Sequence, residues 1–132
     1  MIIPFVRRIA PLAVFAAALL GLAACSRPAP FEFTTTTPTI DLGSNAVVEV
    51  RLKNNVSGTF VNDAVITATR LDMAPDGMEA MASKIVPQAS GEPGVFRFTA
   101  DFRMAGQWQL SLAAHVPGEP TPVQGSVVIN VE

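Results

Sequence analysis

The methionine thioethers are the chemically most unusual groups in this sequence. Apart from the initiator, every methionine lies between positions 73 and 104: Met73, Met78 and Met81 in DMAPDGMEAM, and Met104 in FRMAG. Thioether sulfur is a soft ligand, and soft ligands select Cu(I) over hard cations. If the two segments meet at one end of the fold, several sulfurs could converge on one copper-type ion.

The segment that carries three of these methionines also contains turn-forming and acidic residues. Pro75, Asp76 and Gly77 favour an exposed loop after a strand rather than a buried element. The spacing of its carboxylates does not match an EF-hand calcium loop. Methionine also fills gaps in cores and lines adaptable contact surfaces. Core packing and a contact surface for a protein partner therefore stay open beside metal binding.

The remaining reactive side chains give little support for catalysis. The sequence has no tyrosine, no G-x-S-x-G or H-E-x-x-H pattern and no glycine-rich phosphate loop. Ser111 and the only histidine, His115, share one face of a predicted strand and would point away in parallel. Strand alternation places His115 outward and Trp108 inward as a core anchor. We expect a protein that is not an enzyme.

The first 25 residues have the layout of an export signal. Arg7 and Arg8 precede an apolar stretch that ends in small residues before Cys25. A retained transmembrane helix is the alternative, but the uncharged run 9–24 is shorter than the roughly 20 apolar residues that span a bilayer. The ending LAAC resembles the lipobox of bacterial lipoproteins. This resemblance implies removal of residues 1–24 and diacylglycerol on the sulfur of Cys25.

The position of Cys25 predicts where the protein acts. Cys25 is the only cysteine, so neither an internal disulfide nor a cysteine-based zinc site can form. A lipid-anchored domain facing the periplasm follows, with the membrane as its partner. Ser26 stands where an aspartate usually signals inner-membrane retention, which favours the outer membrane. Residues 26–30, SRPAP, suit a short semi-extended spacer.

Charge and size narrow the function further. The whole chain has nine basic and eleven acidic residues; without Arg7 and Arg8 seven basic residues remain, so the net charge falls from −2 to about −4. Scattered basic residues do not provide the clustered charge that nucleic-acid phosphates require. The roughly 108 residues left after the signal suit one domain with one core.

Alternating apolar residues predict an all-β domain. The expected strands are 31–37, 46–53, 64–71, 83–88, 95–103, 107–116 and 123–131, separated by glycine, proline and asparagine turns. The strand at 83–88 contains Pro87, so we expect it at the edge of a sheet. About seven such strands predict an immunoglobulin-like β-sandwich, with an open barrel as the alternative. We divide the exported chain into a lipidated spacer with the first strand, 25–37, and a sandwich domain, 38–132.

Two stretches, DMAPDGMEAM and GEPGVFRFTADFRMAGQWQLSLAA, together with the last strand resemble the FixH/YtkA-like domain family. The resemblance covers residues 38–131 and implies an exported immunoglobulin-like sandwich. It also implies copper handling, with Met73, Met78, Met81 and Met104 as the candidate metal ligands. The family context implies partners in metal-efflux pumps or cytochrome oxidase maturation, although a lipobox here replaces the transmembrane anchor of the FixH branch.

These observations predict a lipid-anchored periplasmic binding protein with a copper-type metal site or a metal-efflux accessory role. The alternative is a protein-interaction module that binds no metal and assists an envelope complex.

Overall fold

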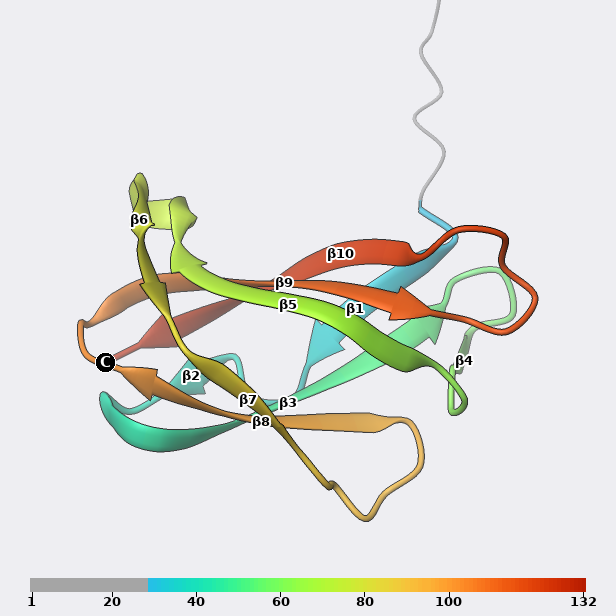
Figure 1. Cartoon of the computed structure of the whole chain (residues 1–132), viewed down its shortest axis with the longest axis horizontal. Helices are drawn as coiled ribbons and strands as arrows, with labels where there is room; N and C mark the ends of the chain where they lie inside the picture. Colours follow the sequence, from blue (N-terminus) through green and yellow to red (C-terminus); the bar gives the residue numbers. More distant parts are fainter. Residues whose placement is uncertain (1–28) are drawn as a thin grey trace, which may run out of the picture.

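The computed structural model describes residues 29–132, which form two face-to-face β-sheets (Figure 1). One sheet has the order β1 (Phe31–Thr35), β3 (Gly43–Asn54), β8 (Val95–Phe102) and β7 (Ile85–Gln88), and β4 (Thr59–Phe60) also pairs with β3. The other has the order β2 (Thr39–Ile40), β10 (Val123–Val131), β9 (Gly106–His115), β5 (Val65–Met73) and β6 (Met78–Ser83). A 3-10 turn, η1 (Ala74–Asp76), joins β5 to β6. The fold is the predicted immunoglobulin-like β-sandwich, not an open barrel.

The hydrophobic core lies between the two sheets. In three strands the predicted alternation is confirmed, since the following inward residues are all buried: Val48, Val50 and Leu52 of β3; Phe98, Ala100 and Phe102 of β8; Trp108, Leu110, Leu112 and Ala114 of β9. The rings of Phe102 and Trp108 pack edge to face, with centroids 5.5 Å apart. Each large apolar side chain buried in this way stabilises the fold by about 1.5–3 kcal/mol.

The alternation in β5 changes face partway along the strand. The register between β5 and β9 shifts between Ile66 and Ala68, which marks a β-bulge. A bulge inserts one residue and so reverses the side on which later residues lie. Val65 is consequently 60% exposed, whereas Leu71, which the sequence placed on the same face, is buried.

The strand predicted at 83–88 contains a change of sheet: its residues 85–88 form β7, whereas Ser83 is the last residue of β6, most of which lies in the segment predicted as a loop. β6 ends at Ser83 and pairs with β5, while β7 begins at Ile85 and pairs with β8. The chain therefore crosses from one sheet to the other at Lys84. β7 lies at the edge of its sheet, as expected for a strand that contains Pro87. The described residues form ten strands rather than about seven, because this division and the two-residue strands β2 and β4 were not predicted.

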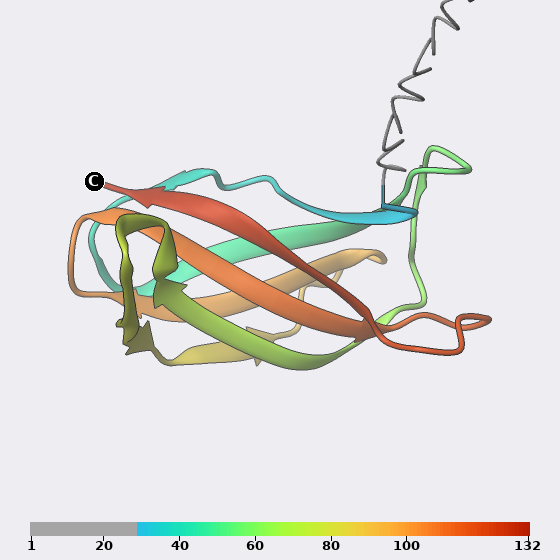
Figure 2. The same cartoon turned by 90° about the horizontal axis from the view of Figure 1, so that it is seen from above.

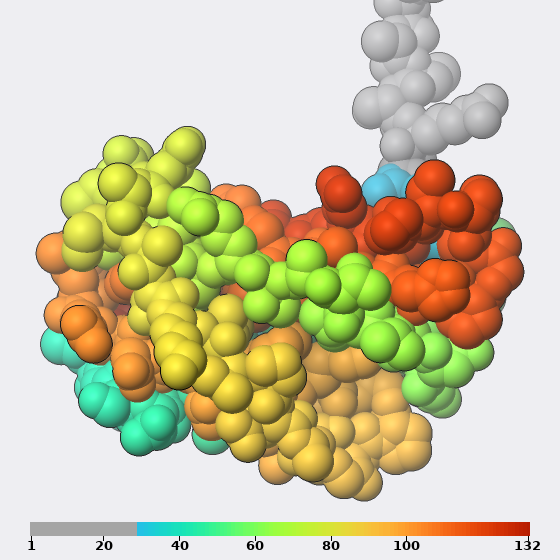
Figure 3. Space-filling view, viewed as in Figure 1, coloured from blue at the N-terminus to red at the C-terminus, as the bar shows by residue number. Residues whose placement is uncertain are grey.

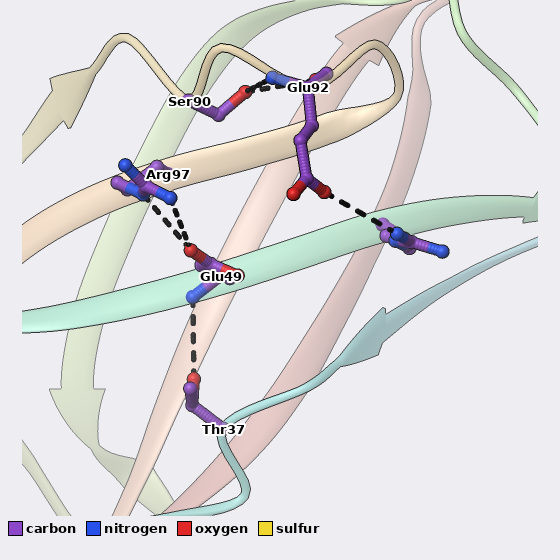
Figure 4. Close-up of polar contacts among 6 residues, drawn as sticks. Thr37, Glu49, Ser90, Glu92 and Arg97 are labelled. Atoms are coloured by element: carbon purple, nitrogen blue, oxygen red, sulfur yellow. Dashed lines mark hydrogen bonds and ion pairs between the residues drawn. The ribbon is translucent and has the colours of Figure 1, made fainter.

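Polar contacts cover the outer face of the β1-β3-β8-β7 sheet (Figure 4). Arg97 on β8 donates from Nε and Nη2 to Oε1 of Glu49 on β3, at 3.0 and 2.8 Å. The backbone N–H of Glu49 donates to Oγ1 of Thr37 at 3.3 Å. Because both partners of the ion pair are partly exposed, it contributes no more than about 1 kcal/mol. These contacts fix register and leave the core as the main source of stability.

The sandwich has two distinct ends (Figure 2). At one end lie the start of β1, the β3–β4 turn and the β9–β10 loop; at the other lie the C-terminus and the hairpin formed by β5, η1 and β6. β3 runs between the ends over 12 residues, a length of roughly 35 Å. No helix within residues 29–132 is long and apolar enough to cross a membrane.

Candidate functional site

The candidate site lies at the end of the sandwich that holds the β5–η1–β6 hairpin, hereafter the hairpin (residues 65–83). The turn between β8 and β9, residues 103–105, reaches the same end (Figure 2). The two segments that supply the non-initiator methionines are therefore adjacent, although β7 and β8 separate them along the chain. This is the proximity that convergence of sulfur ligands requires.

A buried carboxylate holds the hairpin in shape. Asp72 is only 6% exposed; its Oδ1 accepts a hydrogen bond from the N–H of Ala74 at 3.0 Å, and its Oδ2 accepts one from Nε of Arg70 at 2.7 Å. Nη2 of Arg70 also donates to the carbonyl of Glu79 at 3.0 Å, from across the hairpin. A buried charge needs such partners to offset its lost hydration. Asp72 thus has a structural role and is not free to bind a metal.

A second aspartate attaches the hairpin to β9. Oδ2 of Asp76 accepts a hydrogen bond from the backbone N–H of Gln107 at 2.9 Å. Gly106, just before it, has φ +139°, and a Cβ there would lie 2.7 Å from Cε of Met73 and against Oδ2 of Asp76. A side chain at position 106 would force Met73 or Asp76 to move, and the positive φ also favours glycine there. Gly106 is therefore the contact point between the hairpin and β9.

The indole of Trp108 stabilises the β8–β9 turn from the core side. Its Nε1 donates to the carbonyl of Met104 at 3.0 Å, while its ring packs against Phe102 in the core. A buried indole N–H normally finds such a partner. Gly106 and Trp108 thus have complementary roles. Gly106 contacts the hairpin, and the indole of Trp108 holds the β8–β9 turn through the carbonyl of Met104.

The four predicted metal ligands do not form one set. Met73 is fully buried and belongs to the core, whereas Met78, Met81 and Met104 are 36%, 40% and 40% exposed. The expectation of a loop from Met73 to Met81 is wrong, because Met73 ends β5 and Met78 begins β6, with the two residues paired in register. Pro75, Asp76 and Gly77 correctly indicated a turn, but the sequence did not show that paired strands begin and end directly beside it. We call the end that carries Met78, Met81 and Met104 the methionine end.

Two of the exposed methionines line the same hollow. Met81 from β6 and Met104 from the β8–β9 turn border a cavity of about 250 Å³, together with Trp108. The charged residues that line it are Lys84, Asp101 and Arg103. Asp101 already accepts a hydrogen bond from the N–H of Asn45 at 2.9 Å. The hollow therefore offers two soft sulfur donors beside an aromatic ring and little free carboxylate.

The other candidate residues lie elsewhere. His115 is exposed, as the sequence predicted, and ends β9, so nine residues of strand, roughly 30 Å, separate it from Gly106 at the methionine end. His115 cannot join Met81 and Met104 on one ion. No group of three His, Cys, Asp or Glu residues that could hold a metal occurs within residues 29–132. Cys25 lies outside the described residues.

A larger hollow, of about 450 Å³, lies on the outer face of β5, β9 and β10. Figure 3 shows this face hollowed between the hairpin and the β9–β10 loop. Its lining is small and mostly neutral, with Ser111 and Ser126 near its middle. Arg70 is its one charged residue and already bonds Asp72 and Glu79.

The sequence did not indicate the structural roles of Asp72, Asp76 and Gly106. The sequence offered two local signals for these roles. One is the pair of aspartates beside a short turn, and the other is a glycine two residues before the core tryptophan. Each signal was local, whereas the contacts of Asp76 and Gly106 join segments at least 30 residues apart. Asp72 bonds Arg70 and Ala74, each two positions away, but its burial was not apparent from the sequence. Sequence spacing alone does not identify such pairs.

Comparison with known protein families identifies the family of this chain. A family model described as YtkA-like matches residues 26–113, which include the hairpin, Met104 and Trp108. No protein of curated function matches the sequence significantly.

Solved structures of low similarity include a Lin-41 filamin domain, 16% identical with a TM-score of 0.45, where the match covers 78% of this chain and 92% of that one. Another is a ZirS C-terminal domain, 12% identical with a TM-score of 0.48, where the match covers 100% of this chain and 82% of that one.

The contact at Gly106 yields a stability prediction with a matched control. Gly106→Ala should destabilise the protein because the new Cβ would collide with Met73 and Asp76. Gly118, at φ +91° with nothing within 4 Å of its Cβ position, shares the positive φ without the contact. We expect Gly118→Ala to cost about 1 kcal/mol of unfolding free energy and Gly106→Ala about 1–3 kcal/mol more, measured by urea denaturation. Equal losses would show that the close contact is unimportant.

Proposed function

The chain belongs to the YtkA-like family, and we propose that it is a lipid-anchored envelope domain that binds Cu(I) weakly through the thioethers of Met81 and Met104. The observation that carries this proposal is the shared hollow, in which both side chains lie beside Trp108. Met81 lies on β6 and Met104 in the turn between β8 and β9, so only the folded domain brings them together. Binding would therefore depend on the fold.

The donor set suits a soft cation and not a hard one. Two thioethers are neutral, polarisable ligands that favour Cu(I), whereas calcium or magnesium needs a cage of oxygens. Trp108 borders the hollow but is only 2% exposed, so the proposal rests on the two thioethers. Lys84 and Arg103 oppose the ion's charge, and Asp101 is the only acidic residue in the lining. Neutral ligands and this charge balance together keep the expected affinity low.

The other two methionines lie outside the proposed site. Met78 is partly exposed on the same strand as Met81 but does not line the hollow, so it is not part of the proposed site. Met73 has no accessible surface and contacts the Gly106 region. Binding through Met73 would require the hairpin to open and is not part of the proposed site.

The location of the protein is a further part of the proposal. The export signal, the lipobox ending at Cys25 and the spacer together support attachment to the periplasmic face of a membrane, the outer membrane where the cell has two. A diacylglycerol anchor has two chains, which hold a domain stably where one chain does not. The Cu(I) site would then act within the envelope, beside a metal-efflux or respiratory complex.

A second candidate function is a protein contact that uses the methionine end without metal. Three partly exposed methionines at one end of a small domain support it, because flexible thioether side chains adapt to a partner surface. Such a module would assist an efflux pump or cytochrome oxidase assembly. Metal titration distinguishes the two functions.

We expect the exported protein to bind Cu(I) in competition with a chromophoric chelator under anaerobic, reducing conditions. Met81→Leu with Met104→Leu should raise Kd at least tenfold, about 1.4 kcal/mol, because both sulfurs are lost while the apolar volume is kept. Met78→Leu is the matched control, since Met78 has a similar exposure and does not line the hollow, and it should leave Kd unchanged. Unaltered binding by the double variant would contradict the site, and absence of binding by the wild type would favour the protein-contact function.

Lipid attachment has its own test. Cells that produce the protein should incorporate a labelled fatty acid into it and retain it in the membrane fraction. Cys25→Ser should abolish labelling and leave the signal uncleaved by the lipoprotein pathway, since no sulfur remains to accept diacylglycerol. An unlabelled wild-type protein in the soluble fraction would contradict lipid anchoring and leave the Cu(I) site untouched.

A further inference from the structure

The start of the described chain is bound to one particular turn. The carbonyl of Ala29 accepts a hydrogen bond from Nδ2 of Asn55 at 2.9 Å, and the carbonyl of Pro30 accepts one from the N–H of Asn55 at 2.8 Å. Figure 2 shows the beginning of β1 beside the β3–β4 turn, at the end opposite the hairpin. The path by which the chain enters the domain is thus fixed to the β3–β4 turn, residues 55–58.

The distance from this turn to Cys25 is short. Only three residues lie between Cys25 and Ala29, and the four Cα–Cα steps of a fully extended chain between them span at most about 14 Å. If Cys25 carries diacylglycerol, as the proposed function states, its backbone lies at the membrane surface. The β3–β4 turn must then lie close to the lipid headgroups.

The turn has the chemistry of a lipid-contacting surface. Residues 54–62 contain no charged side chain, and Val56 at the turn is 85% exposed, with Phe60 44% exposed. Oδ1 of Asn54 accepts hydrogen bonds from the N–H groups of Val56 and Ser57 at 2.9 and 3.2 Å. The turn is therefore held in shape while it presents an apolar side chain to solvent.

Cationic side chains accompany this apolar turn. The guanidinium of Arg51 lies 5.0 Å from the centre of the Phe60 ring, and Lys53 pairs in register with Phe60. Basic residues next to apolar ones suit the phosphate layer of a bilayer. Glu119 in the β9–β10 loop lies near Ala29 at the same end, so strong attraction to anionic lipid is not expected.

We propose that the β3–β4 turn docks into the headgroup region of the membrane, with Val56 inserted, and so orients the domain. This proposal rests on the lipid anchor of the proposed function. The lipid surface is the occupant because the tether is too short to hold the turn far from it. In this orientation the methionine end lies roughly 35 Å from the turn and points away from the membrane.

The test uses full-length lipidated protein in phosphatidylcholine vesicles. The single thiol in Ser57→Cys, with the Cys25 sulfur acylated, takes an environment-sensitive fluorophore beside an intact Val56. Leu42→Cys is the matched control: Leu42 is 48% exposed and its N–H bonds the carbonyl of Glu132 at the methionine end. We expect a blue-shifted emission and at least twofold quenching by brominated lipid at position 57, and neither effect at position 42.

Each outcome decides the proposal. Val56→Asp in the Ser57→Cys protein should abolish the quenching while the protein still floats with the vesicles. Equal quenching at positions 57 and 42, or quenching that survives Val56→Asp, overturns docking through Val56 but leaves the lipid anchor intact. Failure of the wild type to float with vesicles overturns the anchor and the docking together, and neither result affects Cu(I) binding.

Discussion

The close packing of the hairpin against Gly106 organises the methionine end of this protein. Met73 enters the core below the hairpin, Asp76 bonds the N–H of Gln107 above it, and Gly106 leaves the space that both require. Two residues later, Trp108 fixes the carbonyl of Met104. The same short segment thus determines where β6 lies and where the β8–β9 turn lies. The positions of Met81 and Met104 follow from these contacts.

The arrangement separates two uses of methionine within one sequence. Met73 acts as core filling, the role that flexible apolar side chains commonly have. Met81 and Met104 remain partly exposed and share a hollow in which few carboxylates are free. A site built on a rigid sheet end holds its donors more reproducibly than one on a free loop. This is the physical basis for the proposal that two of the four methionines bind a soft metal.

Much of the fold could be predicted from the sequence, because period-two alternation directly records which side chains face a core. β3, β8 and β9 were predicted with the correct faces for this reason. The bulge in β5 and the crossing at Lys84 were not predicted, since both depend on pairing with distant strands. The candidate site was predicted only in part: residue type indicated sulfur chemistry, but the burial of Met73 depends on its contact with Gly106, 33 positions further along the chain. Local patterns carry no information about such contacts.

The most direct test of the central claim is X-ray absorption at the copper edge of the Cu(I)-loaded protein. The account predicts a first coordination shell with two sulfur atoms as its protein donors, which disappears in the protein with Met81→Leu and Met104→Leu. A first shell in which nitrogen or oxygen supplies the protein donors, unchanged by these two substitutions, would contradict it.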